Sequence, residues 1–158
     1  MQGVILFSHG SVLCGAERNL LGLAGRMRER GEMPIVEVAF LNYTEPDFET
    51  AVGRCVEQGA TKIVIAPYFL IAGKFVLADL PATINSVRPR YPHVTFSTVG
   101  VIGFHRALAD AVIASASVAR PPAAWEDAAV DNSAWCREQP KCPLFGSTLC
   151  RVRTEVPA

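Results

Sequence analysis

The sequence predicts an α/β domain of three layers, in which a four-stranded parallel sheet carries helices on both faces. Strand-like and helix-like segments alternate four times before about residue 117. The strand-like segments are continuous apolar, β-branched runs, which are typical of strands buried on both faces. Because parallel neighbours need crossover connections, a helical segment after each strand fits this architecture. We expect one domain over residues 1–117 and a tail over residues 118–158.

The predicted strands cover residues 4–7, 35–41, 62–66 and 94–101. The first helix ends at Gly31, a natural C-terminal cap. The second helix begins with a capping pattern in which Thr44 caps, Pro46 suits the first turn and Asp47 completes the box. The third begins near residues 79–81 and the fourth covers residues 104–116. The residues expected to face inward are Leu20, Leu23, Ala24 and Met27, then Phe48, Ala51, Val52 and Cys55, then Leu80, Ile84 and Val87, and last Leu108, Ala111 and Val112.

Composition and charge exclude several classes of protein. Lysine plus arginine total 15 and aspartate plus glutamate total 15, which disfavours a protein that binds nucleic acid through its phosphates. No run approaches the roughly 18 apolar residues of a membrane-spanning helix. The chain opens without a cationic leader, and its five cysteines are an odd, scattered set. We therefore expect a cytoplasmic protein that contacts neither nucleic acid nor membrane.

In a parallel sheet, ligands bind outside the carboxyl ends of the strands. Four predicted loops lie there, over residues 8–15, 42–45, 67–79 and 100–105. His9 ends the first strand, where an imidazole could act as a general base or a metal ligand, or could simply be hydrogen-bonded. Ser11 offers a hydroxyl, but the Gly-x-Ser-x-Gly elbow of hydrolases and the glycine-rich nucleotide loops are absent.

The third loop is long and strongly apolar, which suits either a flat apolar ligand or packing on the next helix. Lys74 in this loop could meet an acidic substituent or be an ordinary solvated charge. His105 opens the fourth helix and could reach the same edge or lie on the surface. We include Ser11, Lys74 and His105 as predicted substrate-binding residues, and His9 as the predicted catalytic residue and metal ligand.

Seven short segments, in order and at matching spacing, resemble the small CbiX/SirB family of sirohydrochlorin chelatases, of the class II chelatase superfamily. They read HGS at 9–11, VAFL at 38–41, TEP at 44–46, QGATKIV at 58–64, PYFL at 67–70, AGK at 72–74 and DLP at 79–81. The resemblance covers residues 1–116. It implies a chelatase-like fold, a homodimer and the insertion of Co²⁺ or Fe²⁺, as substrate, into an acidic tetrapyrrole for cobalamin or sirohaem synthesis.

The resemblance also implies that His9 is the first active-site histidine and that no organic cofactor is needed. Arg18, Lys74 and Arg106 are the cations that could meet the carboxylates of the substrate. Members of the family carry a second metal-binding histidine and, three residues later, a glutamate, where this chain has Phe75 and Ala78. This departure leaves open an alternative function, that of a non-catalytic paralogue that binds a tetrapyrrole or a metal.

The tail contains Cys136, Cys142 and Cys150, whose spacing differs from that of zinc knuckles and common iron–sulfur sites. Some plant members of the family carry an iron–sulfur centre in a C-terminal extension. Three cysteines are one short of the usual four ligands, unless Cys14, Cys55 or a partner chain contributes. We favour reduced thiols over an iron–sulfur cluster or a zinc ion in this tail.

Overall fold

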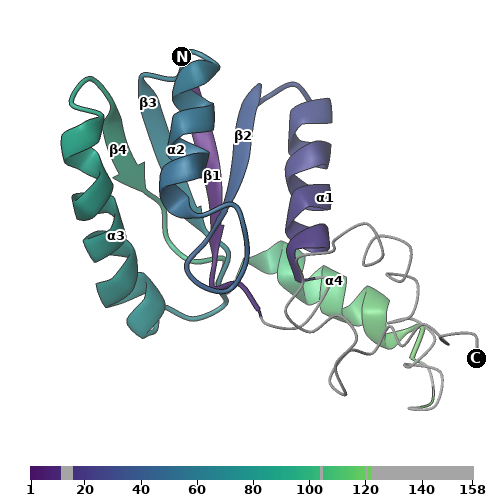
Figure 1. Ribbon diagram of the computed structural model, residues 1–158. Helices are drawn as coiled ribbons and strands as arrows, with labels where there is room; N and C mark the ends of the chain where they lie inside the picture. The colour runs from purple at the N-terminus through teal and green to yellow at the C-terminus, as the bar shows by residue number, and fades with distance from the viewer. Residues whose placement is uncertain (12–15, 104, 120, 122–158) are drawn as a thin grey trace, which may run out of the picture. The chain divides into compact units, whose positions relative to one another are not determined.

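The computed structural model describes residues 1–11, 16–103, 105–119 and 121, and it divides into two units. The first unit holds the sheet and three helices, and the second holds the fourth helix, α4 (Figure 1). The strands are β1 (Gln2–Ser8), β2 (Ile35–Phe40), β3 (Lys62–Pro67) and β4 (Thr95–Thr98). The α-helices are α1 (Ala16–Glu29), α2 (Phe48–Glu57), α3 (Leu80–Val87) and α4 (Arg106–Ala116). Within the described ranges, no helix is both long enough and apolar enough to cross a membrane.

The sheet confirms the predicted parallel architecture. Its strand order is β2-β1-β3-β4, with all neighbours parallel. β4 is shorter than the predicted strand over residues 94–101, because its pairing with β3 stops at Ile65 opposite Thr98, whereas β3 continues to Pro67 beside β1 alone. One further bond joins Val99 N–H to the Ile65 carbonyl, after which the chain leaves the sheet.

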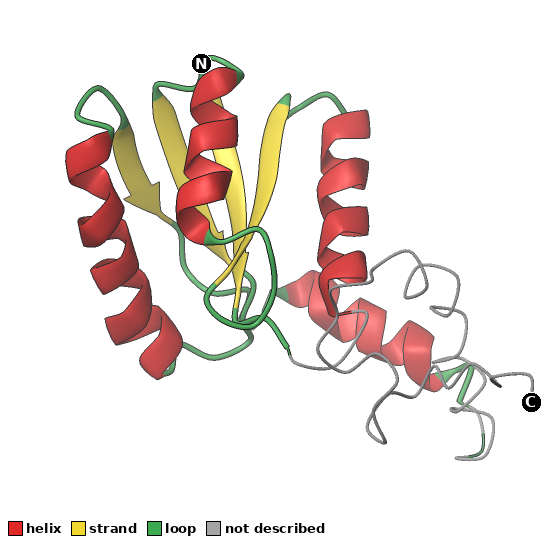
Figure 2. Cartoon of the chain, in the orientation of Figure 1, coloured by secondary structure: helices red, strands yellow, loops and turns green. Residues whose placement is uncertain are grey.

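Helices cover both faces of the sheet in the first unit, as predicted (Figure 2). Alternate residues of β1 point to opposite faces, so Ile5 and Phe7 pack with α2 and α3, whereas Val4 and Leu6 pack with α1. In α1, Leu20 and Ala24 are buried, and Leu23 and Met27 pack beside them. Gly31 follows this helix at a φ of 74°, as its predicted cap requires.

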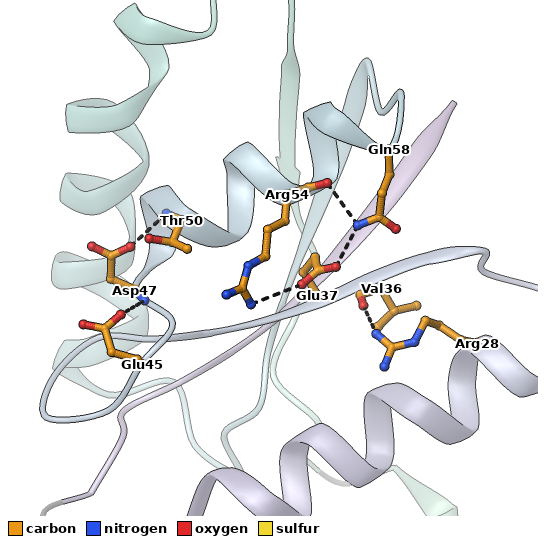
Figure 3. Close-up of polar contacts among 8 residues, drawn as sticks. All are labelled: Arg28, Val36, Glu37, Glu45, Asp47, Thr50, Arg54 and Gln58. Atoms are coloured by element: carbon orange, nitrogen blue, oxygen red, sulfur yellow. Dashed lines mark hydrogen bonds and ion pairs between the residues drawn. The ribbon is translucent and has the colours of Figure 1, made fainter. Parts of the chain in front are cut away.

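The start of α2 corrects the predicted cap. Asp47, and not Thr44, is the N-cap residue: its carboxylate accepts a hydrogen bond from Thr50 N–H at 2.8 Å (Figure 3). Pro46 precedes the helix, joined to Glu45 by a cis peptide bond. The Thr44 hydroxyl bonds instead to the main chain of Ser11, which explains why it does not cap α2. The predicted apolar side of α2 is buried as expected.

The loop after β3 is shorter than the predicted range of residues 67–79. Residues Phe75–Asp79 form a π-helical turn, η1, that leads directly into α3. Leu80, Ile84 and Val87 are buried, which confirms the predicted inward face. A 3-10 turn, η2 (Arg88–Arg90), then leads to β4.

α4 begins at Arg106, after His105 as its N-cap. α4 belongs to the second unit, so the prediction that Leu108, Ala111 and Val112 face inward, towards the sheet, stays a prediction. Helical spacing identifies residues that share a side of a helix, but that side is buried only where another element covers it. The predicted tail, apart from residues 118, 119 and 121, lies outside the described residues.

Polar side chains tie β2 to the helices beside it (Figure 3). Glu37, in the middle of β2, accepts a hydrogen bond from Gln58 at 2.8 Å and lies 3.9 Å from the guanidinium of Arg54, both from the α2 region. On the other side, the guanidinium of Arg28 in α1 donates to the main-chain carbonyl of Val36. These contacts hold one strand between two helices.

Candidate functional site

The candidate site lies where β1, β2 and β3 end at one edge of the sheet. Ser8 pairs with Phe40 across β1 and β2, and Phe7 pairs with Pro67 across β1 and β3. The three loops that follow these strands therefore begin side by side, which confirms the predicted position of His9 at a shared edge.

The loops after β1 and β2 are joined by main-chain hydrogen bonds. The N–H groups of Leu41 and Asn42 donate to the carbonyl groups of Ser8 and His9, each at 2.9 Å. Thr44 Oγ1 accepts from Ser11 N–H and donates to the Ser11 carbonyl, both at 3.1 Å. The pairing of β1 with β2 thus continues beyond the last strand residues and fixes the backbone around His9.

Gly10 is what allows the two loops to come this close. Its φ is +84°, a left-handed value that disfavours any side chain. A β-carbon at this position would lie 1.9 Å from the carbonyl oxygen of Asn42, well inside contact distance. The glycine after His9 is therefore required by the close approach of the loop that holds Asn42, as well as by the left-handed turn of its own backbone.

The His9 imidazole has polar partners at both ring nitrogens. Its Nδ1 lies 3.0 Å from the Gly10 carbonyl oxygen, and its Nε2 lies 3.4 Å from Nδ2 of Asn42. Imidazole in such a setting can accept a proton or bind a divalent cation when it is neutral. The side chain is half-buried, so a ligand can reach it.

Aromatic rings flank the same imidazole. The Phe75 ring lies 4.3 Å from the His9 ring between centroids, and the Tyr43 ring lies 6.0 Å away. Phe69 continues this group, at 6.2 Å from Phe75 and 6.4 Å from the core residue Phe7. Phe75 is the residue that stands where the resemblance predicts a second histidine, and the structure places it directly against His9.

Large apolar side chains of the loops at this edge are exposed to solvent. Two of them, Tyr43 and Ile71, are 70% and 79% exposed. The full set in the loops after β2 and β3, including η1, is Tyr43, Tyr68, Leu70, Ile71, Phe75 and Leu77. Exposed apolar side chains in the loops at the carboxyl ends of parallel strands are a feature of binding sites for apolar or aromatic ligands.

The other predicted site residues have the following surroundings. Lys74 forms an exposed ion pair with Asp79, at 3.3 Å from Nζ to Oδ1. Ser11 is half-buried and held by Thr44 through its main chain. His105 belongs to the second unit, where its Nδ1 accepts a hydrogen bond from Ala107 N–H at 3.3 Å. Their role in substrate binding stays a prediction.

Among the residues that the structure describes, no group of three or more histidine, cysteine, aspartate or glutamate side chains could hold a metal ion. Cys14, Cys136, Cys142 and Cys150 lie outside the described residues, as does the side chain of Arg18. Cys55 is buried in the core, and burial raises the pKa of its thiol to about 12, with Glu37 adding to the effect.

Sequence reasoning missed Asn42 and the hydrogen bonds of Thr44. Asn42 follows β2 by two residues, and β2 is the direct neighbour of β1, so strand order would have placed it beside His9. The order of strands in a parallel sheet is not encoded in periodicity, and the sequence alone therefore gave no reason to pair these two residues.

Comparisons with known proteins bear on the same region. The family model described as CbiX matches residues 3–119. The chain is 33% identical to a sirohydrochlorin cobaltochelatase of Methanocaldococcus jannaschii over 91 residues, which is 58% of this chain and 64% of that protein. It is 32% identical to a sirohydrochlorin ferrochelatase of Bacillus subtilis over 111 residues, which is 70% of this chain and 42% of that protein.

Solved structures give the same picture. A putative cobalamin biosynthesis CbiX protein of Marinobacter aquaeolei matches with a TM-score of 0.63 and 26% identity, over 74% of this chain and 95% of that one. SirB of Bacillus subtilis with Fe³⁺ matches with a TM-score of 0.68 and 30% identity, over 76% of this chain and 48% of that one. The chain thus spans less than two thirds of the length of the two curated relatives.

Proposed function

This chain belongs to the CbiX family, and from that premise we propose that it is a sirohydrochlorin chelatase that inserts Co²⁺ or Fe²⁺ into its substrate. The relatives described above carry this activity in their names, with cobalt in one case and iron in the other. The observation that carries the proposal is the position of His9, a half-buried imidazole at the end of β1 beside an exposed apolar surface.

The chemistry needs few groups. A divalent ion enters the macrocycle as two protons leave two pyrrole N–H groups, so charge is conserved. The His9 imidazole can hold the entering cation or accept one of these protons, since both roles use a nitrogen lone pair. The rings of Tyr43 and Phe75 flank His9 and offer apolar surface for a flat macrocycle.

Three further residues are proposed to contact the substrate. Lys74 carries an exposed ammonium group whose present partner is Asp79 of the same segment, and exposed ion pairs exchange partners readily. A carboxylate of an acidic tetrapyrrole is a suitable alternative partner for this group. Ser11 lies two residues after His9, and His105 caps α4, so each offers a polar group for the edge of the substrate.

The proposal also includes the partners and location expected from the sequence. We expect a homodimer, as the family resemblance implies, and light scattering on the purified chain would measure its mass. An odd set of five cysteines favours a reducing compartment, and the cytoplasm is the location we propose. Neither nucleic acid nor membrane is an expected partner.

An anaerobic absorbance assay tests the activity. Sirohydrochlorin is mixed with Co²⁺ or Fe²⁺, and the rate of the spectral change with wild-type protein is compared with the uncatalysed rate. The variant His9→Ala should lose about 100-fold of the enzymatic rate, in the range of a lost general base. The matched control is His93→Ala, which removes an exposed histidine that precedes β4. His93→Ala should retain the wild-type rate.

A wild-type rate equal to the uncatalysed rate with Co²⁺ and with Fe²⁺ would overturn the proposal. If that protein still bound the tetrapyrrole, the non-catalytic alternative would replace it. Equal rates for wild type and His9→Ala, both above the uncatalysed rate, would keep the activity but remove His9 from it.

A further inference from the structure

We propose that Asn42 is a positioning residue for His9, whose side-chain amide holds the imidazole in the tautomer with the lone pair on Nε2. The inference deepens the proposed function and rests on it for the role of Nε2 as the nitrogen that meets the metal ion or the proton. The observation behind it is a contact between side chains from two neighbouring strand ends. Asn42 Nδ2 lies 3.4 Å from His9 Nε2.

The tautomer follows from the partner of the other ring nitrogen. His9 Nδ1 lies 3.0 Å from the Gly10 carbonyl oxygen, and a carbonyl oxygen only accepts hydrogen bonds. Nδ1 therefore carries the proton and donates a hydrogen bond to the Gly10 carbonyl oxygen. In a neutral imidazole this leaves Nε2 with the lone pair, as a hydrogen-bond acceptor. An acceptor nitrogen needs a donor opposite it, so Asn42 presents its NH₂ group and not its oxygen to the ring.

The main chain keeps this pair together. The N–H of Asn42 donates to the carbonyl of His9 itself at 2.9 Å, so the two residues are joined through backbone as well as through side chains. The N–H of Thr44 donates to the Asn42 carbonyl at 2.8 Å, and Thr44 in turn bonds to Ser11. Both side chains of the pair thus start from backbone positions that the loops fix.

An amide suits this position better than a carboxylate would. A carboxylate only accepts hydrogen bonds, so an aspartate here would draw a proton onto Nε2 and remove its lone pair from use. The asparagine can also turn its amide by half a rotation and present Oδ1 instead. In that orientation Oδ1 can accept a hydrogen bond from a newly protonated Nε2 or lie next to a cation bound at Nε2. The same side chain can therefore contact His9 both before and after the Nε2 lone pair has bound a proton or a metal ion.

Nitrogen NMR of the histidine rings tests the inference directly. The full-length chain is labelled with ¹⁵N, without metal or tetrapyrrole, and observed at mildly alkaline pH. The three histidines are assigned by comparison with His9→Ala, His93→Ala and His105→Ala. We compare wild type with Asn42→Asp and Asn42→Ala, and with Asn85→Asp, which makes the same chemical change at an exposed residue of α3.

In wild type, the His9 resonances should show a proton on Nδ1 and a lone pair on Nε2. Asn42→Asp should move the proton-bearing signal to Nε2, Asn42→Ala should increase the population of the Nε2–H form, and Asn85→Asp should leave the wild-type pattern. A proton on Nε2 in wild type would overturn the inference. So would a His9 pattern that stays the same in both Asn42 variants.

The NMR result is independent of the absorbance assay. If the protein inserts no metal but His9 shows the predicted tautomer and its dependence on Asn42, the proposed function fails and this inference stands. If metal insertion is observed while His9 shows Nε2–H, only the inference about Asn42 fails. Should Asn42→Asp fail to fold, Asn42→Ala and the wild-type spectrum decide the question.

Discussion

Alanine in place of Gly10 should force apart the two loops that carry His9 and Asn42. The new β-carbon would lie 1.9 Å from the Asn42 carbonyl oxygen, whereas carbon and oxygen atoms that are not bonded approach to about 3.3 Å. The loops must therefore separate by roughly 1 Å or more. The φ of +84° at this residue adds strain for any side chain.

The cost can be worked out from the bonds that the separation breaks. The hydrogen bond from Asn42 N–H to the His9 carbonyl and the two between Ser11 and Thr44 all cross between the loops. Each contributes about 0.5–1.5 kcal/mol, and left-handed backbone costs an L-residue ~1–2 kcal/mol. We expect Gly10→Ala to lower the free energy of unfolding by about 3–6 kcal/mol.

Urea unfolding followed by circular dichroism measures this difference. The matched control is Gly25→Ala in α1, where a β-carbon would meet no atom within 4 Å. Alanine in a helix is more stable than glycine by about 0.5–1 kcal/mol, so the control should move in the opposite direction. A Gly10→Ala variant within about 0.5 kcal/mol of wild type would refute the reasoning, because a tolerated surface change has that size.

Three further predictions follow from other residues. Phe75→His should raise the affinity for Co²⁺ on the order of tenfold, because it places a second imidazole against His9, whereas the control Phe75→Leu should not raise it. Calorimetry measures the Co²⁺ affinity of both variants, and equal affinities would contradict the expectation. Cys55 should resist alkylation in the folded protein at neutral pH and react in urea, as measured by the mass of the peptide that contains it. Because burial raises the pKa of its thiol, the neutral thiol should contribute stability that is full below pH 9.0 and is lost as the pH rises towards about 12. Hydrogen bonds from Thr50 hold the pKa of Asp47 below its usual value, so its contribution is present above pH 3.8 and is lost as the pH falls further. Asp47→Ala should cost about 1 kcal/mol in urea unfolding near neutral pH, whereas Asp47→Asn should keep most of the cap and lose the acid dependence.

The sheet and the buried helix faces could be predicted from the sequence because hydrophobic periodicity reports burial directly. Ile5 and Ile63 lie in continuous apolar runs, and both are fully buried in central strands. Leu80, Ile84 and Val87 recur at helical spacing, and all three are buried in α3. The same kind of pattern in α4 stays a prediction, since that helix belongs to the second unit and periodicity does not report which element covers a helix.

Local capping signals were less reliable than periodicity. Thr44 and Asp47 both favour the start of a helix, and the sequence does not show which of them is needed elsewhere. The choice depends on Ser11, a residue of another loop, whose main chain bonds to the Thr44 hydroxyl. Tertiary contacts of this kind decide helix ends and cannot be read from the local sequence.

The candidate site was predicted in part. His9 could be placed at the edge of the sheet where the strands end, because a residue that directly follows a strand of a parallel sheet lies there. Its contact with Phe75 and its pairing with Asn42 depend on how loops distant in sequence fold back on each other. Strand order decides which loops are neighbours, and nothing in the local pattern reveals that order.

β2 ends the sheet on one side, since the strand order within the described residues is β2-β1-β3-β4. The outer edge of such a strand offers main-chain groups to which a strand of another molecule can add, and proteins commonly block this route to aggregation. In β2 the guanidinium of Arg28 already donates a hydrogen bond to the Val36 carbonyl, which is then not available to a strand of another molecule. Glu37 also places a negative charge in the middle of an otherwise apolar strand. α1, the helix that covers one face of the sheet, thus also protects its β2 edge. In this way the chain can expose apolar side chains at the ends of its strands while the side of the sheet is guarded against pairing with a strand of another molecule.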